Sequence, residues 1–124
     1  MSNNTEIQAK AGKYLTFRIA QEEYGVEILK VREIIGMMPI TRVPKTPEFV
    51  RGVINLRGGV IPVVELRRKF GMEPAPETGE TCVIVVEILK NSEPIQVGIL
   101  VDSVSEVIDI TVSDIEQTPS FGVE

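Results

Sequence analysis

Apolar and polar residues alternate over short runs along this chain, which is the pattern of half-buried β-strands. In the first run Leu15, Phe17 and Ile19 share one face, while Thr16 and Arg18 share the other. Turn-forming residues then lead into a second predicted strand at 24–28. Because the runs are short and closely spaced, and no long helical period occurs, the sequence predicts a mostly β protein built from small barrels.

The alternation breaks down between residues 28 and 50. Apolar positions in 28–36 have helix-like spacing, so this segment predicts either a short helix or an irregular strand that ends near Gly36. Three prolines between residues 39 and 47 then exclude long regular structure. Thr46 followed by Pro47 is typical of a helix start, which predicts one helical turn over 47–50.

The second half of the chain repeats the strand pattern. Residues 81–89 are apolar on both faces and predict a buried central strand, and Asn91–Ser92 turn the chain into a strand at 95–101. Between these halves, 66–70 predict a helical turn and 72–79 a loop, which we expect to separate two barrel subdomains spanning 13–124. Residues 1–12 are polar and are expected to form a disordered tail.

Residues 51–67 read RGVINLRGGVIPVVELR and predict a β-hairpin. Gly58 and Gly59 are expected to supply the positive φ that its turn requires, and Pro62 should lie at a strand edge or bulge. The glycines lie between strands rather than before a helix, which disfavours a phosphate-binding loop. The Arg-Gly-Gly triplet occurs once among strand-forming residues, unlike the repeated, disordered tracts that bind RNA.

Arg57 is the most informative residue of this hairpin. Asn55 and Arg57 alternate with apolar neighbours and are expected to share one face of the first strand. Arg57 either extends its guanidinium group to solvent at a barrel rim or pairs with a carboxylate in a partly buried place. Glu33 is the predicted partner because it lies among Val31, Ile34 and Ile35.

Composition excludes several kinds of function. The chain has no histidine, which removes Ser-His-Asp and Cys-His catalysis and the commonest zinc ligand. Its formal net charge of −5 argues against a nucleic-acid-binding surface. The single Cys82 is expected to be a small core residue in a reducing cytoplasm, and no apolar run is long enough for membrane insertion.

The remaining chemistry would have to come from carboxylates. Each acidic candidate lies singly in its own segment without the spacing of a magnesium site, so we expect all of them to be solvated or in turns: Glu65, Glu87, Asp102, Asp109 and Asp114. We therefore predict no cofactor, no metal and no catalytic residue. A small carboxylate-based or magnesium-dependent enzyme is the rival hypothesis from another class.

Three blocks of sequence resemble the CheW family of chemotaxis coupling proteins. They are EEYGVEILKVREI at 22–34, TPEFVRGVINLRGGVIPVVELRRKFG at 46–71 and VGILVDSVSEVIDI at 97–110. The resemblance implies two intertwined five-stranded SH3-like barrels with no catalytic activity. It further implies a cytoplasmic scaffold that couples the cytoplasmic tips of chemoreceptors to the regulatory domain of the histidine kinase CheA.

The same resemblance implies two contact regions. The receptor-binding groove would include Val31, Glu33, Arg51, Gly52, Asn55 and Arg57, with Glu33 and Arg57 supporting one another. Ser120 and Phe121 would face the kinase regulatory domain.

The chain departs from the family pattern at its end. Family members usually continue through a further glycine-containing segment and another strand, so the second barrel is expected to be incomplete and to invite self-association or strand swapping. A close alternative is a fragment of a larger chemotaxis protein of the CheA or CheV type.

Overall fold

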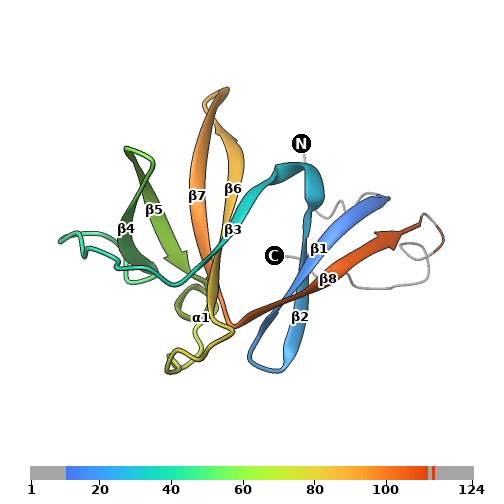
Figure 1. Ribbon diagram of the computed structural model, residues 1–124, viewed down its shortest axis with the longest axis horizontal. Helices are drawn as coiled ribbons and strands as arrows, with labels where there is room; N and C mark the ends of the chain where they lie inside the picture. The colour runs from blue at the N-terminus through green and yellow to red at the C-terminus, as the bar shows by residue number, and fades with distance from the viewer. Residues whose placement is uncertain (1–10, 112, 114–124) are drawn as a thin grey trace.

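The computed structural model describes residues 11–111 and 113, and within them the fold is almost entirely β (Figure 1). The elements in chain order are β1 (Gly12–Ile19), β2 (Glu22–Glu27), the 3-10 turn η1 (Ile28–Lys30), β3 (Val31–Gly36), β4 (Val50–Leu56), β5 (Gly59–Glu65), the one-turn helix α1 (Leu66–Lys69), β6 (Cys82–Lys90), β7 (Glu93–Val101) and β8 (Ser103–Ile110). The prediction of a mostly β protein is confirmed.

The strands form two sheets that interleave along the chain. The larger sheet has the order β3-β6-β7-β5-β4, and the smaller has the order β2-β1-β8. Both sheets therefore take strands from either side of the loop at 72–79. The larger sheet has the five strands expected of a small barrel, whereas the described residues supply three strands to the smaller one. Figure 1 shows α1 at one end of the larger sheet, opposite the tips of the β4–β5 and β6–β7 hairpins.

Strand β6 contributes side chains to two hydrophobic clusters, one on each of its faces. Cys82, Ile84 and Val86 pack in the first cluster with β1 residues such as Phe17, whereas Val83 and Val85 pack in the second, with β4, β5 and β7. This explains why residues 81–89 are apolar on both faces: successive strand residues point to opposite faces of a sheet, and each face of β6 packs against a cluster. The predicted buried strand is confirmed.

The larger sheet curls around the second cluster. Its two edge strands are β3 and β4, and the segment between them contributes Met37, Met38 and Ile40 to the cluster. Thr41 then exchanges two backbone hydrogen bonds of 2.9 Å with Val53 of β4. The irregular segment thus covers the opening that the curled sheet would leave.

Gly52 permits this close approach. Its φ is +149°, and a Cβ atom at this position would lie 2.2 Å from the carbonyl oxygen of Thr41. Any side chain here would push the segment 37–41 away from β4. Gly52 is therefore a packing requirement of the fold.

Two predictions about the segment 28–50 can now be resolved. Residues 28–36 form a single 3-10 turn followed by a strand with a β-bulge, close to the irregular strand that was one of the two predictions. The predicted helical turn over 47–50 is wrong, because β4 already begins at Val50, and the amide of Val50 closes a turn on the Pro47 carbonyl at 3.0 Å. The hydroxyl of Thr46 donates backwards to Val43 and caps no helix.

Pro62 lies inside the sheet but at a place where no amide hydrogen is needed. It is opposite Val53, whose backbone groups are both bonded to Thr41 on the other side. The nitrogen of Pro62 therefore faces β7, and pairing with β7 begins only at Val63. The predicted place at a strand edge or bulge is wrong, because β5 lies between β7 and β4, but Pro62 does occupy a position that needs no amide donor.

Asp102 lies where the chain passes from the larger sheet into the smaller one. Its carboxylate accepts hydrogen bonds from Arg67 of α1 and from the backbone amide of Ala20, at 2.7 Å in each of the closest contacts, and its own amide donates to Arg18. Asp102 lies in the bend between β7 and β8, as the turn prediction allowed, and its hydrogen bonds give it a structural role beyond that prediction. It ties together α1, the β1–β2 turn and the β7–β8 junction.

Candidate functional site

Arg57 lies in the turn at the tip of the β4–β5 hairpin. The hairpin closes at the Leu56–Gly59 pair, and the two turn residues between them, Arg57 and Gly58, have φ of +52° and +84°. Two consecutive positive φ angles are the mark of the tight turn that suits a twisted hairpin. Two expectations are thereby corrected. Gly59 begins β5 and is not a turn residue, and Arg57 lies in the turn rather than on the face of a strand.

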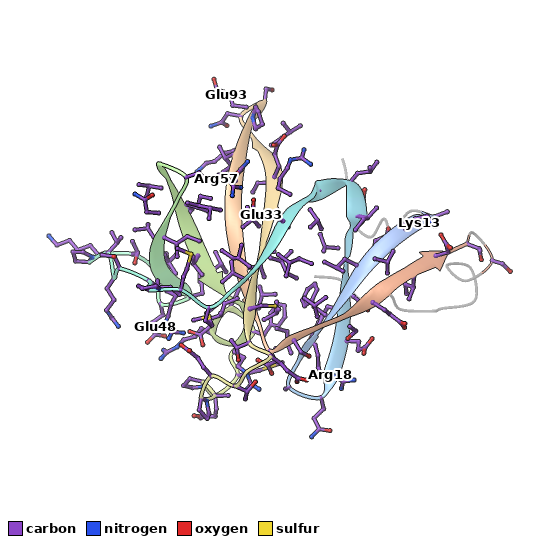
Figure 2. The ribbon with its side chains drawn as sticks, in the orientation of Figure 1. Lys13, Arg18, Glu33, Glu48, Arg57 and Glu93 are labelled. Atoms are coloured by element: carbon purple, nitrogen blue, oxygen red, sulfur yellow. The ribbon has the colours of Figure 1, made fainter. Side chains whose placement is uncertain are left out.

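Arg57 and Glu33 form an ion pair through a hydrogen bond from Nη2 of the arginine to Oε1 of the glutamate (Figure 2). The Arg57 side chain is 71% exposed and that of Glu33 is 27% exposed. The hydrogen bond to Glu33, followed by their mutual attraction, raises the pKa of Arg57 above its usual value. The predicted pairing is confirmed, and it links the two edges of the larger sheet, β3 and the β4–β5 hairpin.

A β-bulge in β3 turns Glu33 toward Arg57. Val31 is opposite Val86 and Glu33 is opposite Val85, so Arg32 is the extra residue. Directly opposed residues share a face of the sheet. Val31 therefore packs against the first cluster, as its neighbour Val86 does, whereas Glu33 lies on the face of the second cluster.

Arg32, the bulged residue, is held on the outside of β3. Its Nε atom donates to Glu87 at 3.1 Å and its Nη1 atom to the carbonyl of Leu29 at 3.2 Å. The hydrogen bond from Arg32 lowers the pKa of Glu87. Glu87 was expected to be solvated; its side chain is 32% exposed, and it also holds the bulged Arg32 in place.

Two further residues surround the hairpin tip. Asn55 is exposed, and its side-chain oxygen accepts a hydrogen bond from the Gly58 amide at 3.2 Å, which stabilises the turn. Val60 is opposite Asn55 and is 66% exposed. The tip thus combines an ion pair with an exposed apolar side chain, a mixture typical of protein contact surfaces.

Arg51 and Gly52 do not belong to this tip. They lie at the other end of β4, roughly 20 Å (Arg51) and 17 Å (Gly52) from Arg57 at about 3.3 Å per strand residue. Arg51 approaches Glu65 of β5 at 3.4 Å, and Gly52 is buried against Thr41. The structure therefore divides the expected groove residues into two groups.

Glu65 was expected to be solvated, and this expectation is wrong. Its side chain is only 8% exposed, and its Oε1 atom lies 3.4 Å from Arg51 and 3.8 Å from Arg68. The Glu65 amide also donates to the carbonyl of Phe49 at 2.7 Å. A signal for this burial was present, because Glu65 falls on the same face of β5 as the core residues Ile61 and Val63.

Asp109 and Cys82, two of the remaining predicted residues, lie in the described part of the chain. Asp109 forms an exposed ion pair with Lys13 at 2.9 Å. Cys82 is buried in the first cluster, where desolvation raises the pKa of its thiol, so its expected role as a core residue is confirmed. Asp114, Ser120 and Phe121 lie outside the described residues.

Neither metal ligands nor a membrane-spanning helix occur in the described part of the chain. Over residues 11–111 and 113, no group of three or more histidine, cysteine or acidic side chains is placed to hold a metal ion. Within the same residues, no helix has the length and apolarity that crossing a bilayer requires.

Comparisons with known proteins agree with the geometry. The model of the CheW-like domain family matches residues 13–124. The chain is 42% identical to chemotaxis protein CheW of Klebsiella aerogenes over 111 residues, covering 90% of this chain and 64% of that protein. It is 38% identical to chemotaxis protein CheW of Rhizobium meliloti over 122 residues, covering 98% of this chain and 76% of that protein.

A solved structure extends the likeness to the fold. The scaffolding protein TtCheW of Thermoanaerobacter tengcongensis superimposes with a TM-score of 0.74 at 38% identity, over 84% of this chain and 68% of that one. The chain thus spans somewhat less than two thirds of the Klebsiella relative and about two thirds of the solved structure. Its sequence and its sheets place it in one family: the chain belongs to the CheW-like domain family.

Proposed function

We propose that this chain is a non-catalytic scaffold that couples chemoreceptors to the histidine kinase CheA in the cytoplasm. The observation that carries the proposal is the family match over residues 13–124. The relatives reported above are named chemotaxis protein CheW, and the structural relative is described as a scaffolding protein. These names do not favour the alternative of a regulatory fragment from a larger chemotaxis protein.

The surface around the Glu33–Arg57 pair is proposed as the receptor contact. Arg57 lies in a closed turn and its guanidinium group is already oriented by a carboxylate, so little freedom is lost when a partner binds. Val60 and Asn55 beside it supply apolar contact and a polar rim. Charged groups arranged in this way set the register and specificity of an interface more than its raw affinity.

The test is a co-sedimentation assay with receptor cytoplasmic tips and CheA. Arg57→Lys keeps the charge but removes the planar fork, so we expect weaker receptor capture and lower kinase activation. Arg18→Lys is the matched control, because Arg18 also forms an exposed pair, with Glu23 at 3.2 Å, but on the smaller sheet. Full assembly and kinase activation by the Arg57→Lys variant would exclude this surface.

The kinase contact is proposed to involve Ser120 and Phe121, on the basis of the sequence resemblance. The Phe121→Ala variant should retain receptor binding and lose affinity for the CheA regulatory domain. Equal losses for both partners would argue against separate contact regions.

Self-association is a further part of the proposal. Among the described residues, β2 and β8 are the edges of the smaller sheet, and edge strands offer unpaired backbone groups to a second chain. Light scattering after size-exclusion chromatography should show a concentration-dependent dimer. A constant monomer mass across the concentration range would refute it.

A further inference from the structure

A hollow at the α1 end of the larger sheet lies apart from the Glu33–Arg57 pair. Its volume is about 720 Å³, and its walls come from residues 42–51, from β5 and α1, and from the loop at 74–75. Figure 2 shows Glu48, one of its lining residues, at the end of the sheet away from Arg57. A ligand in this hollow would therefore not compete with one at the hairpin tip.

The hollow is positively charged in an acidic chain. Four cationic and two anionic side chains line it, which leaves a surplus of two positive charges, whereas the whole chain has a formal net charge of −5. The cationic residues are Arg42, Lys45, Arg51 and Arg68, and the anionic ones are Glu48 and Glu65. A local excess of this kind concentrates anionic groups from solution.

The buried carboxylate of Glu65 organises two of these cations. Arg51 and Arg68 both approach its Oε1 atom, and Arg68 also lies 3.6 Å from Glu48. Their guanidinium groups are thereby held at the wall of the hollow, although both side chains are still more than a third exposed.

The other two cations have no carboxylate partner among the described residues. Arg42 and Lys45 lie three positions apart on the irregular segment that follows Thr41, and both are exposed. Lys45 has a φ of +65°, an unfavourable conformation for a lysine. Prolines on either side of it and a hydrogen bond of 3.0 Å from Thr46 to Val43 hold this segment.

We propose that this hollow binds an acidic segment of a protein partner, with carboxylates of that segment paired to Arg42 and Lys45. The spacing of the two free cations along the chain suits charges spaced along a peptide. A compact dianion such as phosphate is less suited, because Arg51 and Arg68 already share the Glu65 oxygen. The site is a second docking surface, independent of the receptor contact proposed above.

The experiment is a titration of the isotope-labelled protein with an acetylated, amidated hexa-aspartate peptide, followed by amide chemical shifts in phosphate-free buffer. We expect saturable shifts confined to residues 42–51, 65–68 and 74–75, and weaker binding as salt is raised. The Arg42→Glu/Lys45→Glu double variant should bind about tenfold more weakly. Both residues are exposed, so the unchanged spectrum of the rest of the chain will show that the variant is folded.

The Lys30→Glu/Lys90→Glu variant is the matched control, since it makes the same change of net charge by reversing two exposed charges outside the hollow. It should change affinity by less than about twofold. Equal weakening in the control and the double variant would show general charge attraction and overturn the proposal. Shifts spread over the hairpin tip would also overturn it, as would stronger binding of inorganic phosphate or of phosphatidylglycerol vesicles than of the peptide.

Discussion

Two arginine–carboxylate pairs at opposite ends of the larger sheet have very different surroundings. At the hairpin tip, Arg57 reaches Glu33 through a single hydrogen bond. At the sheet junction, Arg67 donates to both oxygens of Asp102, at 3.1 and 2.7 Å, and its side chain is only 19% exposed. Asp102 also accepts from the Ala20 amide, and Arg67 donates to the Glu73 carbonyl.

These different surroundings indicate that one pair serves partner binding and the other stabilises the fold. An exposed pair gains little stability, because water screens the attraction and competes for the same hydrogen bonds. A half-buried group with several partners cannot be removed without leaving the others unsatisfied. We therefore expect the Asp102 network to hold the two sheets in place and the Arg57 pair to contribute chiefly to partner binding.

The largest effect is expected from Asp102→Ala. The change leaves the Arg67 guanidinium and the Ala20 amide without their acceptor, so the free energy of unfolding should fall by about 2 kcal/mol. Denaturant unfolding measures this loss. The control is Asp109→Ala, which removes an exposed partner of Lys13 and should cost no more than about 0.5 kcal/mol. Equal losses in the two variants would remove the distinction between the regions.

An intermediate effect is expected from Glu65→Gln. The substitution keeps the shape of the side chain but removes the charge that Arg51 and Arg68 share. Because both arginines can turn to solvent, the unfolding free energy should fall by only about 1 kcal/mol. A stability equal to that of the unchanged chain would show that the buried carboxylate is dispensable for the fold.

Acid should weaken the sheet junction at Asp102. Hydrogen bonding from Arg67, helped by the Ala20 amide, holds the pKa of Asp102 below its usual value. Its stabilising contribution is thus complete above the unfolded-state pKa of about 3.9 and is lost as the pH falls from there toward the lower folded-state pKa. The stability difference between the unchanged chain and Asp102→Asn should shrink over that window. A constant difference down to strongly acidic pH would contradict the linkage.

The smallest effect on stability is expected at the hairpin tip. Glu33→Gln and Arg57→Gln, singly or together, should leave the denaturant midpoint unchanged, because Arg57 is largely surrounded by water. A double-mutant cycle should show no coupling in unfolding but clear coupling in receptor capture. Strong coupling in unfolding would mean that the pair holds the barrel closed.

Much of the architecture could be predicted from local pattern. The alternation of β1, the doubly apolar β6 and the tight turn at Asn91–Ser92 follow from strand periodicity and turn chemistry. The Glu33–Arg57 pairing was also predicted, since a glutamate among apolar residues needs a cation. The helical turn at 47–50 was not found, because tertiary pairing of β4 with β5 begins at Val50 and outweighs the local helix-start signal.

The sequence by itself determined the strands, the hairpins and the family, because these depend on side-chain period, turn residues and short motifs. Only the tertiary structure decided which charges meet. Glu65 becomes buried between two arginines, and Asp102 becomes the acceptor for groups far away in the chain, because sheet curvature brings distant segments together. A bulge of one residue decides on which face of the sheet Glu33 lies. A bulge exists only relative to the neighbouring strand, and the local sequence does not show which strand that is.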